Sequence, residues 1–462
     1  MLFSSITFLY GFLPIVLAVY LLCPKKFRNA VLLLASLIFY FFGEPIYTVL
    51  LIFSSLSDWL HSLYIESHRG TKGAKIALIS SICINLGLLG FFKYADFFLQ
   101  AIGGLMGLEI PLLNLRLPIG ISFYTFQTMS YTIDVYLGNA KAEKNLGTLA
   151  TFVCLFPQLI AGPIVRYTDV AAELSERDTR AEDLAIGIRR FAVGLGKKVL
   201  IANLAGELCA IFRASGEKSV LFYWIYAVAF TLQIYFDFSG YSDMAIGLGR
   251  MFGFRFPENF NYPYISRTVT EFWRRWHMTL GGWFRDYVYI PLGGNRTTKI
   301  KWLRNILVVW LLTGLWHGAA WNFVLWGGMF GVLLLAEKLL WGKAMEKSRV
   351  FSHIYVMFLV VISFVIFNAD GMTGAWNDLK GMFGFGGVPL VTKESIYYLK
   401  SYAVLLIVAA FGSLPFVKMG YERVKNSRAM LVLEPVGVGL ILIATTACLV
   451  DGSFNPFLYF RF

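Results

Sequence analysis

His317 lies in a sequence setting that suits proton transfer. The segment LWHGAAWN, residues 315–322, separates two strongly apolar blocks, with small residues on one side of the histidine and indoles on the other. Small residues permit close helix approach or a path for a ligand. A neutral imidazole there can accept a proton from an attacking hydroxyl group, a role that contributes about 10² to 10⁴ in rate. The alternative is a histidine that only bonds a carbonyl group across the hairpin, and the residues alone leave both interpretations open.

A second histidine, His277, lies in a segment rich in tryptophan and arginine, residues 271–287. Arg274 and Arg275 precede it closely and Arg285 follows it. Guanidinium groups beside indoles can bind phosphate groups and stack on a base. The alternative is a belt of Trp and Arg at the depth of lipid headgroups, which is common in membrane proteins. Residue types do not decide between the two.

Three acidic residues, Asp134, Asp237 and Asp243, fall inside or beside apolar blocks. A charged side chain there costs about 2.5 to 3.5 kcal/mol on insertion scales, so each needs an explanation. Intramembrane carboxylates can mark an ion or proton pathway, which would favour a transporter. We favour the alternative that they pair with the arginine-rich segment Arg255–Arg304 and stabilise the fold.

The composition of the chain predicts an all-α integral membrane protein. Of 462 residues, 57% are hydrophobic and only 15% are charged, against roughly 25% charged residues in soluble domains. The apolar residues form continuous blocks that suit helices crossing about 30 Å of hydrocarbon, and they lack the alternation of a β-barrel. The net charge of +13 resides in short connections, where topology explains it, so we expect no nucleic-acid partner. Five scattered cysteines show no metal-ligand spacing, and we expect no metal site.

Basic clusters fall on alternate sides of successive apolar blocks, as the positive-inside rule requires. This pattern predicts one polytopic domain over residues 1–462, with about eleven crossings and both termini extracytoplasmic. The block Leu149–Ile164 contains Pro157 and Pro163 and is expected to be re-entrant and buried in protein. The segment Arg255–Arg304, with nine basic and three acidic residues, should face the cytoplasm.

Four motifs run in order through most of the chain: FPQLIAGPI (156–164), DFSGYSD (237–243), the tryptophan- and arginine-rich segment 273–287, and WHG (316–318). Together they resemble the membrane-bound O-acyltransferase family. Within the family, the chain looks most like the bacterial branch that contains the alginate O-acetyltransferase membrane subunit, its peptidoglycan O-acetylating relatives and, more distantly, the D-alanyl transfer protein of teichoic acid synthesis.

The resemblance implies a ring of helices around a tunnel in the bacterial inner membrane. The acyl donor, acyl-CoA and most simply acetyl-CoA, would enter from the cytoplasm as a substrate, with no permanently bound cofactor. The family's essential histidine matches His317, and a second conserved polar position matches His277. The resemblance further implies that a separate secreted or periplasmic acetyltransferase receives the acyl group and completes the O-acetylation of a cell-surface or secreted polysaccharide.

On this basis we expect His317 to act as general base and His277 to position or polarise the thioester carbonyl. Arg274, Arg275 and Arg285 are expected to bind the phosphates of the donor. Two alternatives remain from the sequence: a secondary transporter or flippase, which would usually show two related halves that are not evident here, and a lipid acyltransferase of the same family. The sequence leaves the polymer and the acyl group open.

Overall fold

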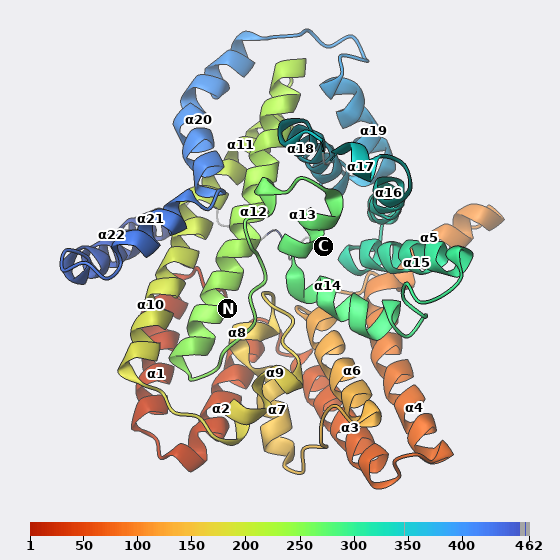
Figure 1. Ribbon diagram of the computed structural model, residues 1–462, viewed down its shortest axis with the longest axis vertical. Helices are drawn as coiled ribbons and strands as arrows, with labels where there is room; N and C mark the ends of the chain where they lie inside the picture. The colour runs from red at the N-terminus through yellow and green to blue at the C-terminus, as the bar shows by residue number, and fades with distance from the viewer. Residues whose placement is uncertain (346, 453–457, 459–462) are drawn as a thin grey trace. The chain divides into compact units, whose positions relative to one another are not determined.

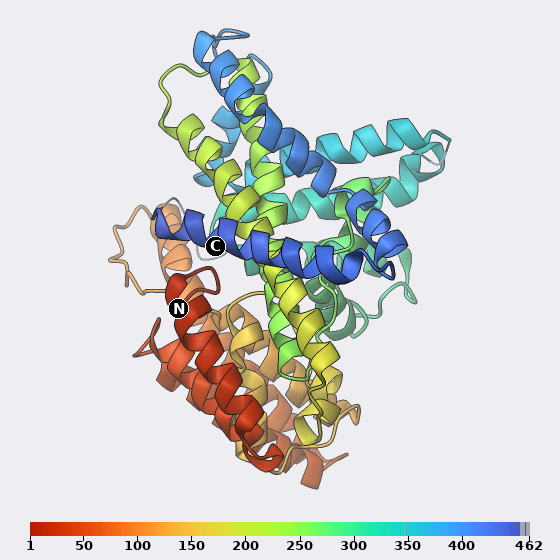
Figure 2. The same cartoon turned by 90° about the vertical axis from the view of Figure 1, so that its left-hand side faces the viewer.

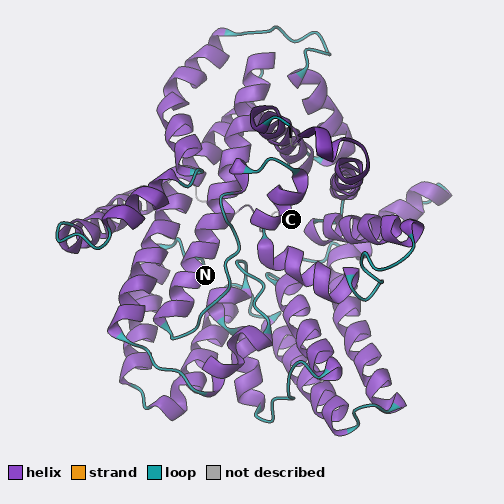
Figure 3. Ribbon diagram, viewed as in Figure 1, coloured by secondary structure: helices purple, strands orange, loops and turns teal. Residues whose placement is uncertain are grey.

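Helices form every regular element in the part of the chain that the structure describes, residues 1–345, 347–452 and 458 (Figure 3). The computed structural model thereby confirms the all-helical fold that the apolar blocks predict. Helices satisfy their backbone hydrogen bonds within one segment, which is what a lipid environment demands.

Seven of these helices are long and apolar enough to cross a membrane. They are Thr48–Ser67, Lys72–Met106, Val220–Met251, Trp321–Trp341, Arg349–Phe367, Lys393–Gly412 and Met430–Val450. The chain is therefore a multi-pass membrane protein. The larger number of crossings, the ring around a tunnel and the single domain stay predictions.

The chain forms two compact units. The first comprises Met1–Phe191 and Ser242–Glu258, and the second comprises Ala192–Tyr241 and Asn259–Phe462. Two helices contribute residues to both units, α10 (Ala181–Gly196) and α12 (Val220–Met251).

In the first unit, α3 (Thr48–Ser67), α4 (Lys72–Leu89) and α6 (Ile121–Leu137) pack side by side (Figure 1). Asp58 of α3 is fully buried and accepts hydrogen bonds from Ser81 Oγ (2.6 Å) and Asn85 Nδ2 (2.8 Å) of α4. Thr128 of α6 donates in turn to Asn85 Oδ1 (3.0 Å). Polar side chains of these helices thus satisfy one another inside the unit. The other helices of this unit, besides its parts of α10 and α12, are η1 (Thr7–Phe12), α1 (Leu13–Leu22), η2 (Lys25–Phe27), α2 (Arg28–Phe41), η3 (Gly90–Tyr94), α5 (Ala95–Met106), α7 (Leu146–Cys154), α8 (Phe156–Leu159) and α9 (Tyr167–Ser175).

The block predicted to be re-entrant is short, broken and buried. Helix α7 ends at Cys154, and α8 begins at Phe156 with Pro157 in its first turn. Leu155 between them has non-helical backbone angles, φ −54° and ψ 109°. Residues 151–165 are all buried inside the first unit, which agrees with a segment that is covered by protein rather than lipid.

The second unit contains both candidate histidines, His277 and His317, and the three candidate arginines, Arg274, Arg275 and Arg285. Figure 2 shows two of its long helices, α20 and α22, joined through α21. Its helices, besides its parts of α10 and α12, are η4 (Lys197–Ala202), α11 (Asn203–Ala214), η5 (Pro263–Ile265), α13 (Val269–Arg275), α14 (Met278–Phe284), η6 (Arg285–Tyr289), α15 (Lys299–His317), α16 (Trp321–Ala336), η7 (Glu337–Trp341), α17 (Gly342–Met345), α18 (Arg349–Phe367), α19 (Gly371–Met382), α20 (Lys393–Gly412), α21 (Phe416–Val424) and α22 (Met430–Val450).

Helix α12 continues past the apolar residues around Phe238 and ends at Met251. Its two acidic residues are neutralised within the protein. Asp237 pairs with Lys198 (2.6 Å), and both side chains are 3% exposed. In the first unit Asp243 pairs with Arg190 (3.0 Å). Ion pairing is therefore confirmed for Asp237 and Asp243, but Lys198 and Arg190 lie outside the segment Arg255–Arg304. The third acidic residue, Asp134, accepts a hydrogen bond from Asn139 Nδ2 (3.3 Å).

Two glycines set the spacing of the hairpin formed by α15 and α16. A Cβ atom on Gly314 would lie 2.3 Å from the carbonyl oxygen of Phe323, and one on Gly327 would lie 2.3 Å from that of Trp310. Both contacts are with backbone atoms, which cannot move aside as a flexible side chain can. The two helix backbones therefore approach closely just below the turn that carries His317, as small residues permit.

Gly327→Ala is expected to lower the thermal unfolding temperature of the purified protein and its activity together. The added methyl group forces the hairpin apart, and such overpacking costs about 1–3 kcal/mol or more. The matched control is Gly328→Ala on the next position of α16, where the new Cβ would meet only Leu311 Cδ2 at 3.6 Å, an ordinary contact. Equal unfolding temperatures for the two variants would contradict this role of Gly327.

Candidate active site

His317 is the last residue of α15 and is nearly buried, with 6% of its surface exposed. Three aromatic rings pack edge-on against its imidazole, at centroid distances of 5.1 Å for Trp316, 5.2 Å for Trp326 and 5.2 Å for Phe367. These rings come from α15, α16 and α18. The hairpin predicted from the sequence is present, and it places the imidazole in a largely dry aromatic environment.

His277 links α13 and α14 and is 1% exposed. Its backbone is left-handed, with φ 44° and ψ 52°, a conformation that is uncommon for a residue other than glycine. Met278 N donates to Asn259 O (2.9 Å), and Gly281 N donates to His277 O (3.1 Å). Surrounding hydrogen bonds thus maintain the turn that presents this side chain, and strained turns of this kind cluster at functional sites.

The hydrogen bonds of Asn259 define which nitrogen of His277 carries the proton. Asn259 Oδ1 lies 3.1 Å from His277 Nδ1, 2.9 Å from Thr279 Oγ1 and 3.4 Å from Thr279 N. A backbone N–H can only donate, so the Asn259 atom that faces it is the oxygen. His277 Nδ1 must then donate to that oxygen, which leaves Nε2 with a lone pair. Nε2 is buried and has no hydrogen-bond partner among the described residues, so it is free to accept a hydrogen bond from a ligand.

The two histidines are electrostatically linked. Burial, and secondarily the nearby charge of His317, hold the pKa of His277 well below its usual value, so its imidazole stays neutral. Its ring also packs against Trp316, the residue before His317, at a centroid distance of 5.8 Å. A neutral His277 with its proton on Nδ1 cannot donate from Nε2. This arrangement suits positioning of a ligand and does not suit polarisation of a carbonyl group.

A cavity of about 510 Å³ reaches His277 from the surface of the second unit. Most of its wall is apolar and aromatic, and three cations also line it. The lining residues are Thr270, Trp273, Arg274, His277, Met278, Leu280, Gly281, Gly282, Phe284, Arg285, Tyr289, Ile306, Val309, Trp310, Thr313, Leu334 and Lys338. An apolar cavity with a few polar groups is typical of a small-molecule site.

The cations of the cavity differ in how far their charges are already satisfied. No hydrogen bond or ion pair of Arg274 is found among the described residues, and Lys338 lies over the ring of Trp302, with Nζ 5.5 Å from the centroid. Arg285 pairs with Asp286 (2.6 Å). The cavity can therefore accept anionic groups, most directly at Arg274 and Lys338.

Arg275 does not line this cavity. Its Nε donates to Glu271 Oε1 (3.0 Å) and its Nη1 to Asn261 O (3.1 Å). The indoles of this segment do not form a lipid-facing belt either, because Trp276 and Trp283 are only 4% and 3% exposed. Trp276 and Trp283 are thus packed inside the protein.

Sequence reasoning missed Glu337 and Lys338, which follow α16 directly. Glu337 is buried and accepts hydrogen bonds from Val269 N (2.7 Å) and Thr270 N (3.3 Å). It thereby caps the start of α13, the helix that presents Arg274 to the cavity, because the first amide groups of a helix have no partner within it. The available signal was these two adjacent charges in the otherwise apolar stretch of residues 323–340.

A family model and several known proteins match this chain, and they all indicate the family that its motifs resemble. Residues 144–374 match the model of the membrane-bound O-acyltransferase family. The chain is 38% identical to "Probable alginate O-acetylase AlgI" of Azotobacter vinelandii, with all of both chains covered. It is 32% identical to the peptidoglycan O-acetyltransferase of Helicobacter pylori, over 100% of this chain and 98% of the relative.

A more distant relative is the teichoic acid D-alanyltransferase of Bacillus subtilis, 29% identical over 55% of this chain and 69% of the relative. The matched family segment contains both histidines and the whole cavity lining, and the first two relatives are matched over nearly their full lengths. The chain therefore belongs to the membrane-bound O-acyltransferase family and is an O-acyltransferase.

Proposed function

We propose that this enzyme takes an acetyl group from acetyl-CoA on the cytoplasmic side and passes it across the inner membrane for O-acetylation of a cell-surface or secreted polysaccharide. The observation that carries the proposal is the cavity, in which free cations and an apolar wall lead to a buried, neutral histidine. Acetyl-CoA matches this cavity, because it carries phosphate groups for the cations at one end and a thioester for the histidine at the other. The names of the relatives that act on alginate and peptidoglycan support an acetyl group and a polysaccharide.

In the proposed reaction, Arg274, Arg285 and Lys338 bind the donor's phosphates by charge-assisted hydrogen bonds. His277 Nε2 accepts a hydrogen bond from an N–H group of the donor and so positions the thioester. His317 takes the proton from the acceptor hydroxyl as its oxygen attacks the thioester carbonyl carbon. When the carbon–sulfur bond breaks, the imidazolium returns the proton to the departing sulfur, and the products are an ester and a free thiol.

The acceptor side of the proposal is an extracytoplasmic one. We propose that a secreted or periplasmic acetyltransferase receives the acyl group and completes its transfer to the polymer, and that both termini of this chain face the same side. Support comes from the alternation of basic clusters along the sequence and from the polymers named for the relatives. Lys418, Arg423, Lys425 and Arg428, for example, all lie between two apolar helices.

Arg274→Ala and Lys338→Ala are each expected to raise the KM for acetyl-CoA by about 10- to 100-fold, because each loses one charge-assisted contact of about 1.5–3 kcal/mol. The measurement is thiol release from acetyl-CoA by the purified protein in proteoliposomes. Arg296→Ala is the control, since Arg296 belongs to the same basic segment but does not line the cavity. Solute flux without thioester cleavage would overturn the proposed function in favour of transport, and labelled lipid without labelled polymer would change the acceptor.

A further inference from the structure

The turn that joins α18 to α19 forms one wall of the His317 environment. Phe367, the last residue of α18, packs its ring against His317 (5.2 Å), Trp326 (5.1 Å) and Phe323 (5.0 Å). The edge-on contact with the imidazole limits how far that ring can rotate. The position of the turn therefore bears directly on the position of His317.

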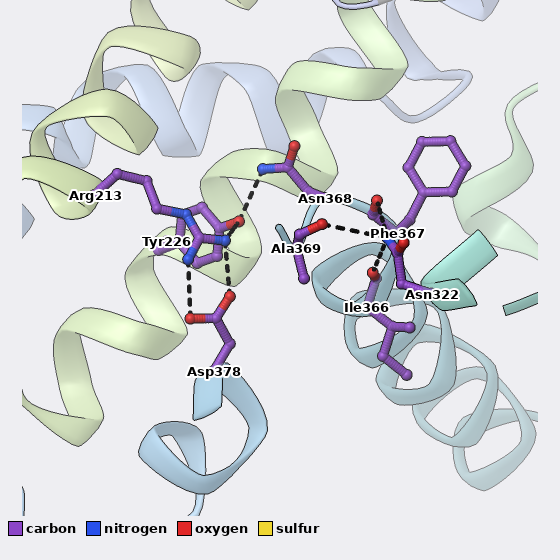
Figure 4. Close-up of polar contacts among 8 residues, drawn as sticks. All are labelled: Arg213, Tyr226, Asn322, Ile366, Phe367, Asn368, Ala369 and Asp378. Carbon is purple, nitrogen blue, oxygen red and sulfur yellow. Dashed lines mark hydrogen bonds and ion pairs between the residues drawn. The ribbon is translucent and has the colours of Figure 1, made fainter. Parts of the chain in front are cut away.

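Asn322 holds this turn from the α16 side (Figure 4). Its Nδ2 donates to the carbonyl oxygens of Ile366 (3.3 Å), Phe367 (3.4 Å) and Ala369 (3.2 Å). All three neighbours are acceptors, so only the amino end of the amide can face them. The last carbonyls of a helix have no partner within it, and Asn322, which is 1% exposed, supplies one. A buried side chain five residues after His317 thus tethers the residue that packs on His317.

A second set of contacts anchors the same turn from the other side (Figure 4). Asn368 Nδ2 donates to Tyr226 OH (2.8 Å), and Arg213 Nη2 donates to the same hydroxyl (2.6 Å). Arg213 also forms a bidentate pair with Asp378 of α19, at 2.9 and 2.7 Å. Bidentate pairs of this type add geometric specificity as well as energy. The chain of contacts therefore connects α11, α12 and α19 to the turn.

We propose that residues 366–369 are a positioning element for His317, and that Asn322 is the positioning residue through which the α15–α16 hairpin keeps Phe367 against the imidazole. The inference rests on the proposed role of His317 as general base. Asn322 does not contact a reacting atom and acts through Phe367. The hydrogen bonds that link Asp378, Arg213 and Tyr226 stabilise the opposite side of the turn.

Asn322→Asp tests the inference, because it keeps the shape of the side chain but turns an oxygen toward three carbonyl oxygens. The expected result is a fall in kcat of about 10- to 100-fold, since displacement by about 1 Å can cost 10²-fold in rate. The KM for acetyl-CoA should stay unchanged, because Asn322 does not line the cavity. Asn322→Gln, which retains the donor group, should recover part of kcat.

Asn305→Asp is the matched control. Asn305 is also fully buried, and its Nδ2 also donates to backbone carbonyls, those of Leu292 (3.1 Å) and Gly294 (3.1 Å). Its substitution should lower the unfolding temperature but leave kcat per folded molecule nearly unchanged. An Asn322→Asp variant with wild-type kcat, or an equal fall in kcat for Asn305→Asp, would overturn the inference. Failure of the proposed function is a separate outcome, which full activity of His317→Gln would reveal.

Discussion

Replacement of His317 by glutamine is expected to lower acyl transfer by about 10² to 10⁴ in kcat, the range for loss of a general base. Glutamine is similar in size and can still hydrogen-bond, but it cannot take a proton from the acceptor hydroxyl. The folded yield should change little, because the aromatic rings around the site can pack on an amide. The measurement is the rate of ester formation from acetyl-CoA under saturating donor.

His353→Gln is the control for this prediction. His353 lies on α18 and contacts Ser266 O through Nδ1 (3.2 Å), and it does not line the cavity. Its substitution should leave kcat within about twofold, as for most changes away from special sites. Wild-type kcat in His317→Gln would remove the proposed base from the mechanism.

Asp237→Leu is expected to destabilise the protein by about 3–5 kcal/mol, because it removes the carboxylate that neutralises the buried ammonium group of Lys198. Lys198→Met should do the same by removing the cation that neutralises the buried carboxylate. The double variant should recover most of the loss, since replacing a buried ion pair by apolar side chains is often neutral or stabilising. Thermal unfolding of the purified proteins in detergent measures all three.

The same three variants distinguish a structural role of the Asp237–Lys198 ion pair from a role in proton transfer. If Asp237 only stabilises the fold, the stable double variant transfers acyl groups at the wild-type rate. If Asp237 carries protons or ions, as a transporter would require, the double variant folds but loses function. Recovery of stability without recovery of function would therefore contradict the structural role.

The hairpin that carries His317 was predictable because its signals are local. Glycine and alanine next to a histidine, between two apolar blocks, describe a tight turn at helical ends, and the structure has α15 end at His317 and α16 begin at Trp321. The break within residues 149–164 was predictable for the same reason, since proline cannot donate a backbone hydrogen bond.

The length of α12 was not predictable from its own residues. Asp237 and Asp243 look like the end of an apolar block, and the cations that neutralise them come from elsewhere in the chain. Arg190 is 53 residues away from Asp243 in sequence, and nothing in the local pattern identifies such a pairing. An ion pair with a residue far away in the sequence can thus let a helix continue through charged positions at which a hydropathy pattern would end it.

Much of the candidate site could not be predicted either, because its contacts also join residues that are far apart in the sequence. Asn322 is 44 to 47 residues away from the carbonyls that it bonds, and Glu337 is 68 residues away from Val269. Arg274 and Arg285 were identified as cations of the site and line the cavity, whereas Arg275, identified with them, is engaged by Glu271. Residue types thus predicted the chemistry of the site. Which of these side chains can bind a ligand depends on the contacts that each makes in the folded protein.

The rings packed around His317 have a spectroscopic consequence. Trp316, Trp326 and Phe367 surround its imidazole edge-on, so its carbon-bound protons experience the ring currents of three aromatic groups at once. In a protein with only five histidines, selective isotope labelling would separate this resonance from the others. The imidazole then becomes an internal magnetic reporter of how its aromatic enclosure responds when donor and acceptor arrive.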